Sequence, residues 1–388
     1  MRGSSARKPK TVLLLIRSLH IGGAERQVVS LAKSMTDLGT TVHVGVKVAG
    51  GPLETDLRVI PGVDLHLLGG SGLVGQLTYF FKLRELIRSR GCDAVYGFMP
   101  LPNLALLITY TLWNRPLIAW GVRSSGIDQS QYGGRVKWTM RFEKWLSRFS
   151  NRVITNSTAA LDEYRVKGYP YSKLEHIQNA INVGRFKPNS DARKKVVNEL
   201  GISTSTFLIG LIARIHPMKD HMTFLKAAKV VIDEGLDVTF ICAGETSEGY
   251  SEYESRVRES ATSMGLDGRV LWVGPRKDPE VVMAACDITT LTSDSGEGFP
   301  NSVAESLATG TPCVSTDVGD AVWIIGEYGT VVPRGGFEEL AMAWKSMMDR
   351  PAEVVSADAE AARNSIIDRF SPDSIAERTL DSLALDIG

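Results

Sequence analysis

Short apolar segments that favour β-strands alternate with longer segments of helical periodicity along most of the sequence, and this alternation is its strongest constraint on the fold. The pattern is typical of βαβ units, which build a parallel, doubly wound α/β sheet. In the first half we predict strands at 11–16, 41–48, 94–97, 116–121 and 153–156, and helices at 24–38, 73–90 and 135–149. In the second half we predict strands at 207–213, 238–243, 270–273, 288–292 and 313–316, and helices at 222–233 and 250–264.

The alternation is interrupted at 179–190, where Asn, Gly, Pro and Ser cluster. Because 388 residues are too many for one ordinary core, we predict two Rossmann-like domains that face a cleft. The expected parts are a disordered tail at 1–9, an N-terminal Rossmann-like domain at 10–185 and a C-terminal Rossmann-like domain at 186–370. Sheets of this kind bind ligands beyond the carboxyl ends of their strands, so the informative residues follow strands.

Composition excludes several classes of protein. Lys and Arg number 44, as do Asp and Glu, so no overall positive charge attracts nucleic acid. The longest apolar region, 101–121, has only about ten continuous apolar residues, about half of what a membrane-spanning helix needs. The four cysteines are Cys92, Cys242, Cys286 and Cys313, and no two of them form a CxxC motif. We therefore expect reduced, buried thiols in a cytoplasmic protein.

Two basic residues follow the strand at 207–213: Arg214 comes directly after it and Lys219 five residues later. Both can therefore reach a ligand at the carboxyl edge of the sheet. A diphosphate leaving group gains negative charge as a sugar bond breaks, and Arg and Lys donors stabilise that charge. The alternative is a solvated loop, which is the commoner setting for two basic residues.

Two glutamates frame the start of a helix that runs to about residue 309. Glu297 lies in the loop before this helix, and Glu305 lies near its second turn. Pro300 and Gly310 stand at the positions expected for the two helix boundaries. The first amides of the helix, together with its dipole, suit a phosphate. The alternative is that Glu305 is a solvated helical residue and Glu297 a favourable charge near a helix start.

Four motifs, in order, resemble the retaining glycosyltransferases of family 4, group 1, which have the two-domain GT-B fold. They are a glycine loop at 20–26, an interdomain segment at 179–188, the basic loop at 213–219 and the pair Glu297 and Glu305. The resemblance extends from about residue 11 to the last helix. In this family the equivalent of that helix, 371–388 here, packs back on the N-terminal domain.

The resemblance implies retaining transfer of a hexose or N-acetylhexosamine from a nucleotide-diphosphate sugar, which we expect to be a UDP-sugar. The implied acceptor is a sugar or a polyprenyl-linked sugar, in cell-surface polysaccharide or glycolipid synthesis. Arg214 and Lys219 would hold the diphosphate, Glu305 the ribose and Glu297 the transferred sugar. Further donor contacts are expected from Gly22, Gly23, Gly274, Arg276, Gly298, Phe299, Pro300 and Asn301. No suitable Asp-x-Asp pair is present, so we expect neither a metal nor a cofactor.

Two residues of the first half are candidates for the acceptor side. His20 stands beside the glycine loop, where it could contact an acceptor phosphate, although a lone histidine is more often structural. Arg123 follows a strand at a place where many relatives have a histidine, which suggests an anionic group on donor or acceptor. Gly22 and Gly23 do not form the motif GxGxxG, so a dinucleotide-dependent oxidoreductase is a poor interpretation. The structural alternative for these two glycines is a simple tight turn.

The predicted helix at 135–149 has an apolar stripe inside a basic surrounding. The stripe consists of Trp138, Phe142, Trp145, Leu146 and Phe149. We slightly favour a core-packed helix with a solvated basic face. The other interpretation is that 135–152 contacts anionic lipid at the inner face of the cell membrane, which would suit a lipid-linked acceptor.

Two other functions are compatible with the same motifs. The nearest is a sugar-nucleotide epimerase or hydrolase of the same architecture. The other is a nucleotide-sugar binding protein without catalysis, which the complete basic pair and glutamate pair disfavour.

Overall fold

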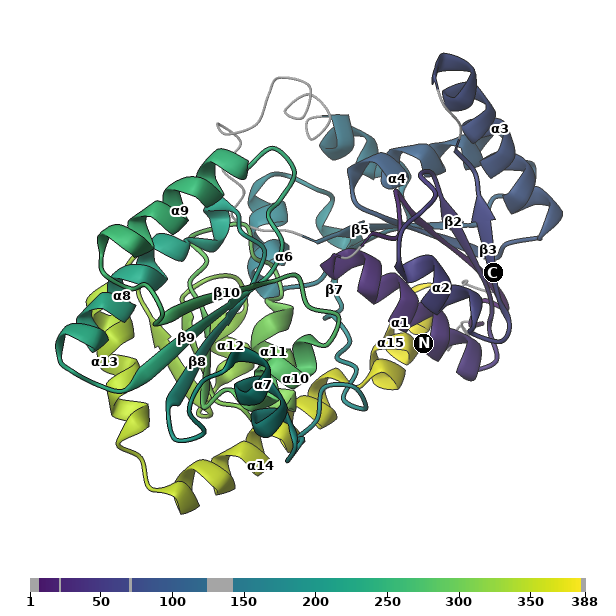
Figure 1. Cartoon of the computed structure of the whole chain (residues 1–388). Coiled ribbons are helices and arrows are strands. Elements are labelled where there is room, and N and C mark those ends of the chain that lie inside the picture. The colour runs from purple at the N-terminus through teal and green to yellow at the C-terminus, as the bar shows by residue number, and fades with distance from the viewer. Residues whose placement is uncertain (1–6, 21, 70–71, 124–141, 385–388) are drawn as a thin grey trace. The chain divides into compact units, whose positions relative to one another are not determined.

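The computed structural model describes residues 7–20, 22–69, 72–123 and 142–384, which form two compact units. Unit 1 comprises Met1–Ala180 and Phe370–Gly388, and unit 2 comprises Ile181–Arg369. Each unit is built on one parallel sheet with helices on its faces (Figure 1). The division between the units lies at 180/181, within the predicted interruption and five residues before the boundary expected from sequence.

Seven parallel strands form the sheet within the described part of unit 1, in the order β3-β2-β1-β4-β5-β6-β7. They are β1 (Thr11–Ile16), β2 (Thr41–Val46), β3 (Val63–Leu67), β4 (Ala94–Phe98), β5 (Leu117–Val122), β6 (Arg152–Thr155) and β7 (Leu174–His176). The central strands β1, β4 and β5 are almost entirely apolar and buried, as expected for parallel strands covered on both faces. The strand order reverses between β1 and β4, which creates a crevice at their carboxyl ends.

The helices of unit 1 cover both faces of this sheet. They are α1 (Gly23–Asp37), α2 (Leu53–Arg58), α3 (Gly72–Ser89), α4 (Pro100–Ala105), α6 (Thr158–Val166) and α15 (Pro372–Ser382), with 3-10 turns η1 (Leu106–Thr111), η3 (Ser147–Phe149) and η4 (Tyr171–Lys173). The last helix, α15, packs beside α1 (Figure 1), and its Ile375 and Leu380 share a core with Val28 of α1. At 7–9, within the expected tail, Lys8 pairs with Asp381 at 2.9 Å.

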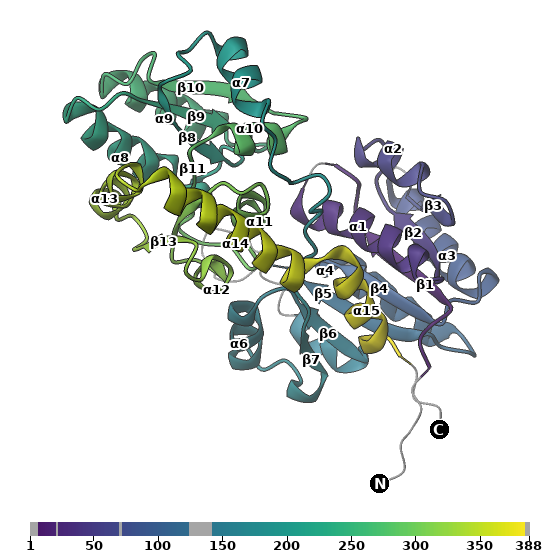
Figure 2. The ribbon, with the colours of Figure 1, turned by 90° about the horizontal axis from the view of Figure 1, so that it is seen from below.

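Six parallel strands form the sheet of unit 2, in the order β10-β9-β8-β11-β12-β13. They are β8 (Phe207–Ile212), β9 (Val238–Ala243), β10 (Val270–Gly274), β11 (Ile288–Leu291), β12 (Cys313–Thr316) and β13 (Gly329–Val332). The helices are α7 (Ala192–Leu200), α8 (His221–Asp233), α9 (Ser251–Ser263), α10 (Pro279–Ala285), α11 (Asn301–Ala308), α12 (Ala321–Ile325), α13 (Phe337–Met348) and α14 (Ala352–Phe370), with the 3-10 turn η5 (Pro217–Lys219). Helices α8 and α13 pack together in one apolar cluster with the sheet, and α7 and α10 in another (Figure 2).

The two sheets confirm the predicted α/β class with doubly wound parallel sheets. All four cysteines are buried and free, as expected. None of the described helices combines the length and the apolar character that crossing a bilayer requires.

Glu143 is a buried acid of unit 1. Its side chain is 2% exposed, and Asn103 Nδ2 donates a 2.9 Å hydrogen bond to its Oε1. The same amide nitrogen donates to the Gly121 carbonyl at 3.1 Å. Burial raises the pKa of Glu143 to about 7, although the hydrogen bond from Asn103 lowers it. The carboxyl therefore keeps its proton in the folded protein at a pH where the unfolded chain has lost it.

We predict that Glu143→Gln stabilises the protein as pH rises. The Glu143 carboxyl has a pKa near 4.5 in the unfolded chain and about 7 in the folded protein. Its contribution to the free energy of unfolding is therefore complete below pH 4.5 and is lost as pH rises from 4.5 to 7. Gln keeps the acceptor for Asn103 and never ionises, so the variant should gain about 2–3 kcal/mol near pH 8 and about nothing near pH 4. Urea unfolding at both pH values measures this difference. Equal stability of the two proteins near pH 8 would show that burial does not raise the pKa of Glu143.

Candidate active site

The crevice of unit 2 lies where its strand order reverses, between β8 and β11. In doubly wound sheets ligands bind outside the carboxyl ends of the strands at such a switch point. The predicted donor residues of unit 2 are concentrated on two loops there: 213–220 follows β8, and 292–300 follows β11. Strand order therefore brings together two loops that are about 80 residues apart in sequence.

The loop after β8 has a fixed backbone. Ile215 forms a parallel bridge to Thr246 beyond the end of β9, and its amide donates to the Glu245 carbonyl at 2.9 Å. The loop then turns through Asp220, which has the left-handed φ of +41° that non-glycine residues rarely adopt. The Asp220 carboxylate accepts from the Thr223 amide at 3.2 Å and from the Thr223 hydroxyl at 2.5 Å, which caps α8 and holds the turn. Lys219 is thereby fixed immediately before the helix.

Lys219 and Glu297 form an ion pair across the switch point. Their side chains are 21% and 14% exposed, so both are largely removed from solvent but still reachable. The Ser293 hydroxyl also donates to Glu297 Oε1, at 2.8 Å. The Thr292 hydroxyl donates to the Lys219 carbonyl at 2.8 Å, and the Asp294 amide to the Met218 carbonyl at 2.9 Å. The two loops are thus joined through side chain and backbone, which holds the ion pair in one geometry.

Two glycines allow the loop 292–300 to pack closely against its neighbours. Gly296 has φ +76°, and a Cβ there would lie 1.5 Å from Met218 Cε. Gly319, which follows β12, has φ +52°, and its Cβ would lie 2.2 Å from the Gly298 carbonyl oxygen. The amide of Asp320 donates to that same oxygen at 2.9 Å. Larger residues at either glycine would displace the backbone around Glu297.

Helix α11 begins directly after this loop. Its N-cap residue is Pro300, which has no polar side chain with which to cap the first amides. No acidic residue occupies the first turn either, so the dipole of this helix end is available to an anion. Glu305, in the second turn, is buried, with 9% exposure. A buried carboxylate needs a specific partner, so the alternative interpretation of Glu305 as a solvated helical residue is wrong.

His216 shows the positive character of the basic loop. Its Nδ1 accepts from the Met218 amide at 3.1 Å, and its ring lies 4.2 Å from that of Tyr250. Burial lowers the pKa of His216, and the positive charges of Arg214 and Lys219 lower it further. The positive charge of the loop itself is carried by Arg214, which is exposed, and by Lys219, which is paired with Glu297.

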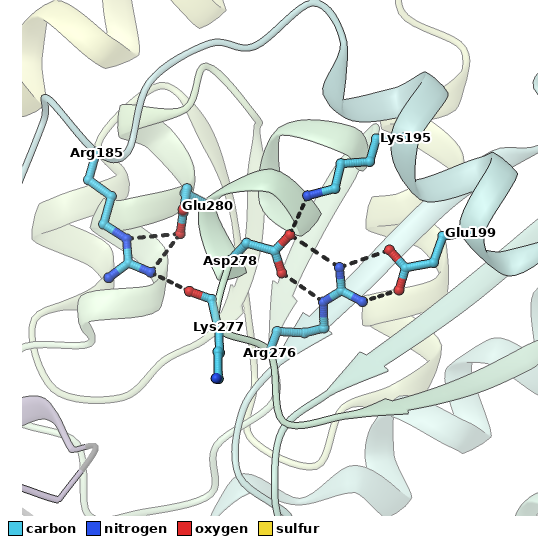
Figure 3. A network of polar contacts seen from close by, with 7 residues as sticks. All are labelled: Arg185, Lys195, Glu199, Arg276, Lys277, Asp278 and Glu280. Atoms are coloured by element: carbon cyan, nitrogen blue, oxygen red, sulfur yellow. Dashed lines mark hydrogen bonds and ion pairs between the residues drawn. The ribbon is translucent and has the colours of Figure 1, made fainter. Parts of the chain in front are cut away.

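Arg276, predicted as a donor-binding residue, is committed to structural ion pairs. Its guanidinium makes a double contact with the Glu199 carboxylate and binds Asp278 at 3.0 and 3.3 Å, while Lys195 binds Asp278 at 2.7 Å (Figure 3). The segment after β10 is thus tied to α7. Any donor contact of this segment would come from its backbone, such as that of Gly274, which has φ +67°.

The predicted acceptor-side residues His20 and Arg123 belong to unit 1, as do Gly22 and Gly23, which were predicted as donor contacts. Gly22 is the N-cap of α1 in extended backbone (φ −158°), and a Cβ there would meet only the flexible Glu25 carboxylate, so its conformation does not require glycine. His20 is exposed beside it. Met99, which follows β4 at the switch point of this sheet, has φ +76° and was not singled out from sequence. Met99 precedes Pro100, and this sequence context does not predict a positive φ.

Arg123, which follows β5, is held by the protein itself. Its guanidinium donates to Asn179 Oδ1 at 2.5 Å and to the Tyr96 hydroxyl at 2.9 Å. It also lies 4.7 Å from the centre of the Phe98 ring. These contacts favour a positioning role over the capture of an anion, and the acceptor role of Arg123 stays a prediction.

Leu146 of the predicted stripe packs against the core, but the described aromatic members of the stripe are exposed, so the favoured interpretation of a core-packed stripe is wrong for Phe142, Trp145 and Phe149. Residues 135–141 lie outside the described residues, Trp138 among them. Phe142 and Trp145 are 51% and 53% exposed, and Phe149 is 38% exposed. The Glu143 side of this helix faces the core, which turns these aromatic rings toward solvent.

The comparisons with known proteins identify the family. Residues 21–185 match the model of glycosyltransferase family 4, and residues 206–350 match the model of glycosyl transferases group 1. The two matches together cover most of both units. The protein belongs to this family of glycosyltransferases.

Individual relatives agree with this assignment. The chain is 24% identical over 324 residues to the putative glycosyltransferase EpsF of Bacillus subtilis, covering 79% of each chain. It is 26% identical over 311 residues to the UDP-Gal:α-D-GlcNAc-diphosphoundecaprenol α-1,3-galactosyltransferase of Escherichia coli, covering 77% of each. The crystal structure of Anabaena HepE with UDP and glucose has the same fold, with a TM-score of 0.84 and 23% identity over 96% of this chain and 98% of that one.

Proposed function

We propose that this glycosyltransferase moves a hexose or N-acetylhexosamine from a UDP-sugar to a sugar acceptor with retention of configuration. The observation that carries the proposal is the Lys219–Glu297 ion pair at the switch point of unit 2, directly before α11. A cation, a carboxylate and a helix N-terminus are the groups that a sugar diphosphate needs. The similarity to a galactosyltransferase named for its UDP-Gal donor and to HepE in complex with UDP supports a uridine nucleotide.

Each group has a role that follows from its chemistry. Arg214 and Lys219 neutralise the diphosphate, whose charge grows as the glycosidic bond breaks, and the amides at 298–301 add dipolar stabilisation. Glu305 accepts hydrogen bonds from the two ribose hydroxyls. Glu297 accepts from the sugar's hydroxyls and keeps Lys219 oriented. Because these groups already supply positive charge, transfer should proceed without a metal ion.

Retention follows if the acceptor attacks from the face that the diphosphate leaves. In that mechanism the acceptor hydroxyl gives its proton to a phosphate oxygen of the leaving group, while the bond from the anomeric carbon to that group breaks. Lys219 stabilises the departing charge and Glu297 the developing positive charge on the sugar ring. No covalent intermediate on Glu297 is required, because its carboxylate is already bound by Lys219 and Ser293.

A panel of UDP-, GDP- and ADP-sugars, tested by thermal shift with wild type and Arg214→Ala, tests the donor assignment. A bound ligand stabilises the fold by RT ln(1+[L]/Kd), so the UDP-sugar should raise the unfolding temperature of wild type more than of the variant. Incubation of a stabilising donor without acceptor distinguishes the rival activities. Rapid epimerisation or hydrolysis of the donor would contradict a transferase, and the absence of any stabilisation would contradict the donor site.

We further propose that the acceptor is lipid-linked and is reached at the inner face of the cell membrane. Unit 1 carries an exposed aromatic and basic surface, which we call the 110–149 surface; its members are Tyr110, Trp113, Arg115, Phe142, Trp145, Arg148 and Phe149. The Phe149 ring lies 5.8 Å from that of Tyr110 and 6.1 Å from that of Trp145. Arg115 lies over the Tyr110 ring and Arg148 over the Trp145 ring, so these five members are continuous. Aromatic rings beside cations suit the interface of an anionic bilayer.

The double variant Phe142→Ala/Trp145→Ala should weaken binding to anionic vesicles by about 30- to 1,000-fold, since each ring loses roughly 1–2 kcal/mol of interfacial contact. Vesicle sedimentation measures this loss. Trp323→Ala is a matched control, because Trp323 is also exposed (43%) and also has an arginine, Arg369, over its ring at 4.2 Å, but lies in unit 2. Equal binding of the double variant and wild type would contradict the membrane contact.

A further inference from the structure

Three potential metal ligands meet at the edge of the sheet of unit 1. His43 lies on β2, and Asp64 and His66 lie on β3, which ends the sheet on this side. His43 is paired with Asp64 in the strand register, so their side chains emerge on the same face. His66, two residues further along β3, emerges on that face as well. The pairing of two strands thus creates a cluster that no local sequence motif encodes.

The spacing of the donor atoms matches a metal site. His43 Nδ1 lies 3.4 Å from Asp64 Oδ2 and 3.2 Å from His66 Nε2. One donor atom from each of the three residues lies within 4.8 Å of the other two. Zinc bonds of roughly 2.0–2.1 Å in a tetrahedron place neighbouring donors about 3.3–3.4 Å apart. Two of the separations therefore need almost no rearrangement to accept an ion.

We propose that His43, Asp64 and His66 form a binding site for a divalent transition-metal ion, with zinc as the best match. Two imidazoles and one carboxylate are a common zinc donor set, and three protein ligands leave a fourth position for water or another ligand. The side chain of His43 is 4% exposed and that of Asp64 is 57% exposed, so the site has a fixed base and an open entrance. The site lies in unit 1 and is separate from the proposed transfer chemistry of Lys219 and Glu297.

The charges around the cluster have opposite effects on the binding of a cation. Asp64 contributes a negative charge that attracts a cation. Arg90, which follows α3, opposes it with a positive charge that acts on both His43 and His66. Removal of the Arg90 charge should tighten binding, which distinguishes a metal site from a hydrogen-bonded pair of histidines.

Binding would join the edge strand β3 to β2. Edge strands have unpaired backbone groups on one side and are held by fewer contacts than central strands. The strand β3 has only partly buried or exposed side chains. An ion with ligands on both strands would add a cross-link at this position, so that zinc should stabilise unit 1 by RT ln(1+[Zn]/Kd).

Titration of zinc chloride into the chelator-treated full chain, followed by calorimetry and thermal unfolding, tests the site. We expect one ion per chain and a rise in unfolding temperature. Asp64→Asn and His66→Asn should each weaken binding by at least about 10-fold, the loss caused even by removal of groups that only support metal ligands. Arg90→Gln should tighten binding. His20→Asn, at an exposed histidine of the same unit, is the control for adventitious binding and should change nothing.

A second measurement uses wild type alone and therefore does not depend on whether a variant folds. Cobalt(II) bound to wild type should give the intense visible bands of a four-coordinate ion, and these bands should disappear on addition of one equivalent of zinc. The absence of saturable zinc binding by wild type, or unchanged binding in both Asp64→Asn and His66→Asn, would overturn the proposal. Cobalt bands typical of six-coordinate, water-rich cobalt would overturn the tetrahedral assignment and with it the preference for zinc.

Discussion

Replacement of Lys219 by methionine is expected to lower the kcat of sugar transfer by about 100- to 1,000-fold, the usual effect of removing one donor that stabilises developing negative charge. Methionine keeps the length and the apolar stem of lysine but removes the ammonium group. The KM for the donor should rise less than kcat falls, because the charge on the diphosphate is greatest in the transition state. Steady-state kinetics with a saturating acceptor measure both quantities.

The control for this variant is Lys226→Met. Lys226 lies on α8 a few residues away and is exposed, with its ammonium 5.6 Å from the Phe337 ring centre. Its loss should leave kcat unchanged. Because Lys219 also pairs with Glu297, the unfolding temperature of Lys219→Met must be compared with wild type. A Lys219→Met enzyme with kcat within about threefold of wild type would contradict the role assigned to the ammonium group.

Glu305→Gln is expected to weaken binding of both UDP and UDP-sugar by roughly 10- to 100-fold, since hydrogen bonds to a charged group contribute about 1.5–3 kcal/mol. A ribose anchor binds ground state and transition state alike, so KM should rise while kcat changes little. This pattern is the opposite of that expected for Lys219→Met. Competition binding with UDP and steady-state kinetics together measure it.

A second donor makes the Glu305 prediction specific. If the carboxylate binds the ribose hydroxyls, a UDP-sugar that lacks the 2′-hydroxyl should bind wild type more weakly but bind Glu305→Gln with little further loss. Such non-additivity is the signature of a direct interaction. Additive losses would indicate that Glu305 acts through the structure of α11, where it is buried, and would remove it from the ribose site.

The order of elements could be predicted from sequence because parallel strands buried on both faces are short, continuous apolar segments. β1, β9 and β12 were predicted with their observed bounds, and the other predicted strands shifted by one or two residues. β3, with the sequence VDLHL, was missed because edge strands carry polar residues. β7 and β13 were missed because three or four residues are too few to show a period. All three missed strands lie at an end of their described sheet, where burial selects apolar residues less strongly.

The helix near residue 145 shows a limit of periodicity. A stripe of aromatic residues at helical spacing indicates that one face is apolar, but it does not tell what that face contacts. Here Phe142 and Trp145 are exposed, while Glu143, the acid beside them, is buried against Asn103. The amide partner that makes this burial possible lies 40 residues earlier, so no local pattern could show it.

Distance along the chain also determines which contacts of the predicted site residues the sequence could show. Glu297 and Lys219 were selected because each follows a strand, and the strand order places them in contact. Ser293, which binds Glu297, was not selected because one serine in a loop carries no spacing signal. Arg276 looked like a free cation in the sequence because its partner Glu199 lies 77 residues away. The donor-binding roles of Glu297, Lys219 and Arg276 stay predictions.

The central claim, retaining transfer at the Lys219–Glu297 crevice, is tested most directly by NMR of a reaction with an α-configured UDP-sugar and a sugar acceptor. The proposed mechanism predicts that UDP is released only when acceptor is present, and that the new glycosidic bond is α. A β-linked product would contradict retention. Release of UDP or epimerisation of the donor at the same rate without acceptor would contradict the transferase itself.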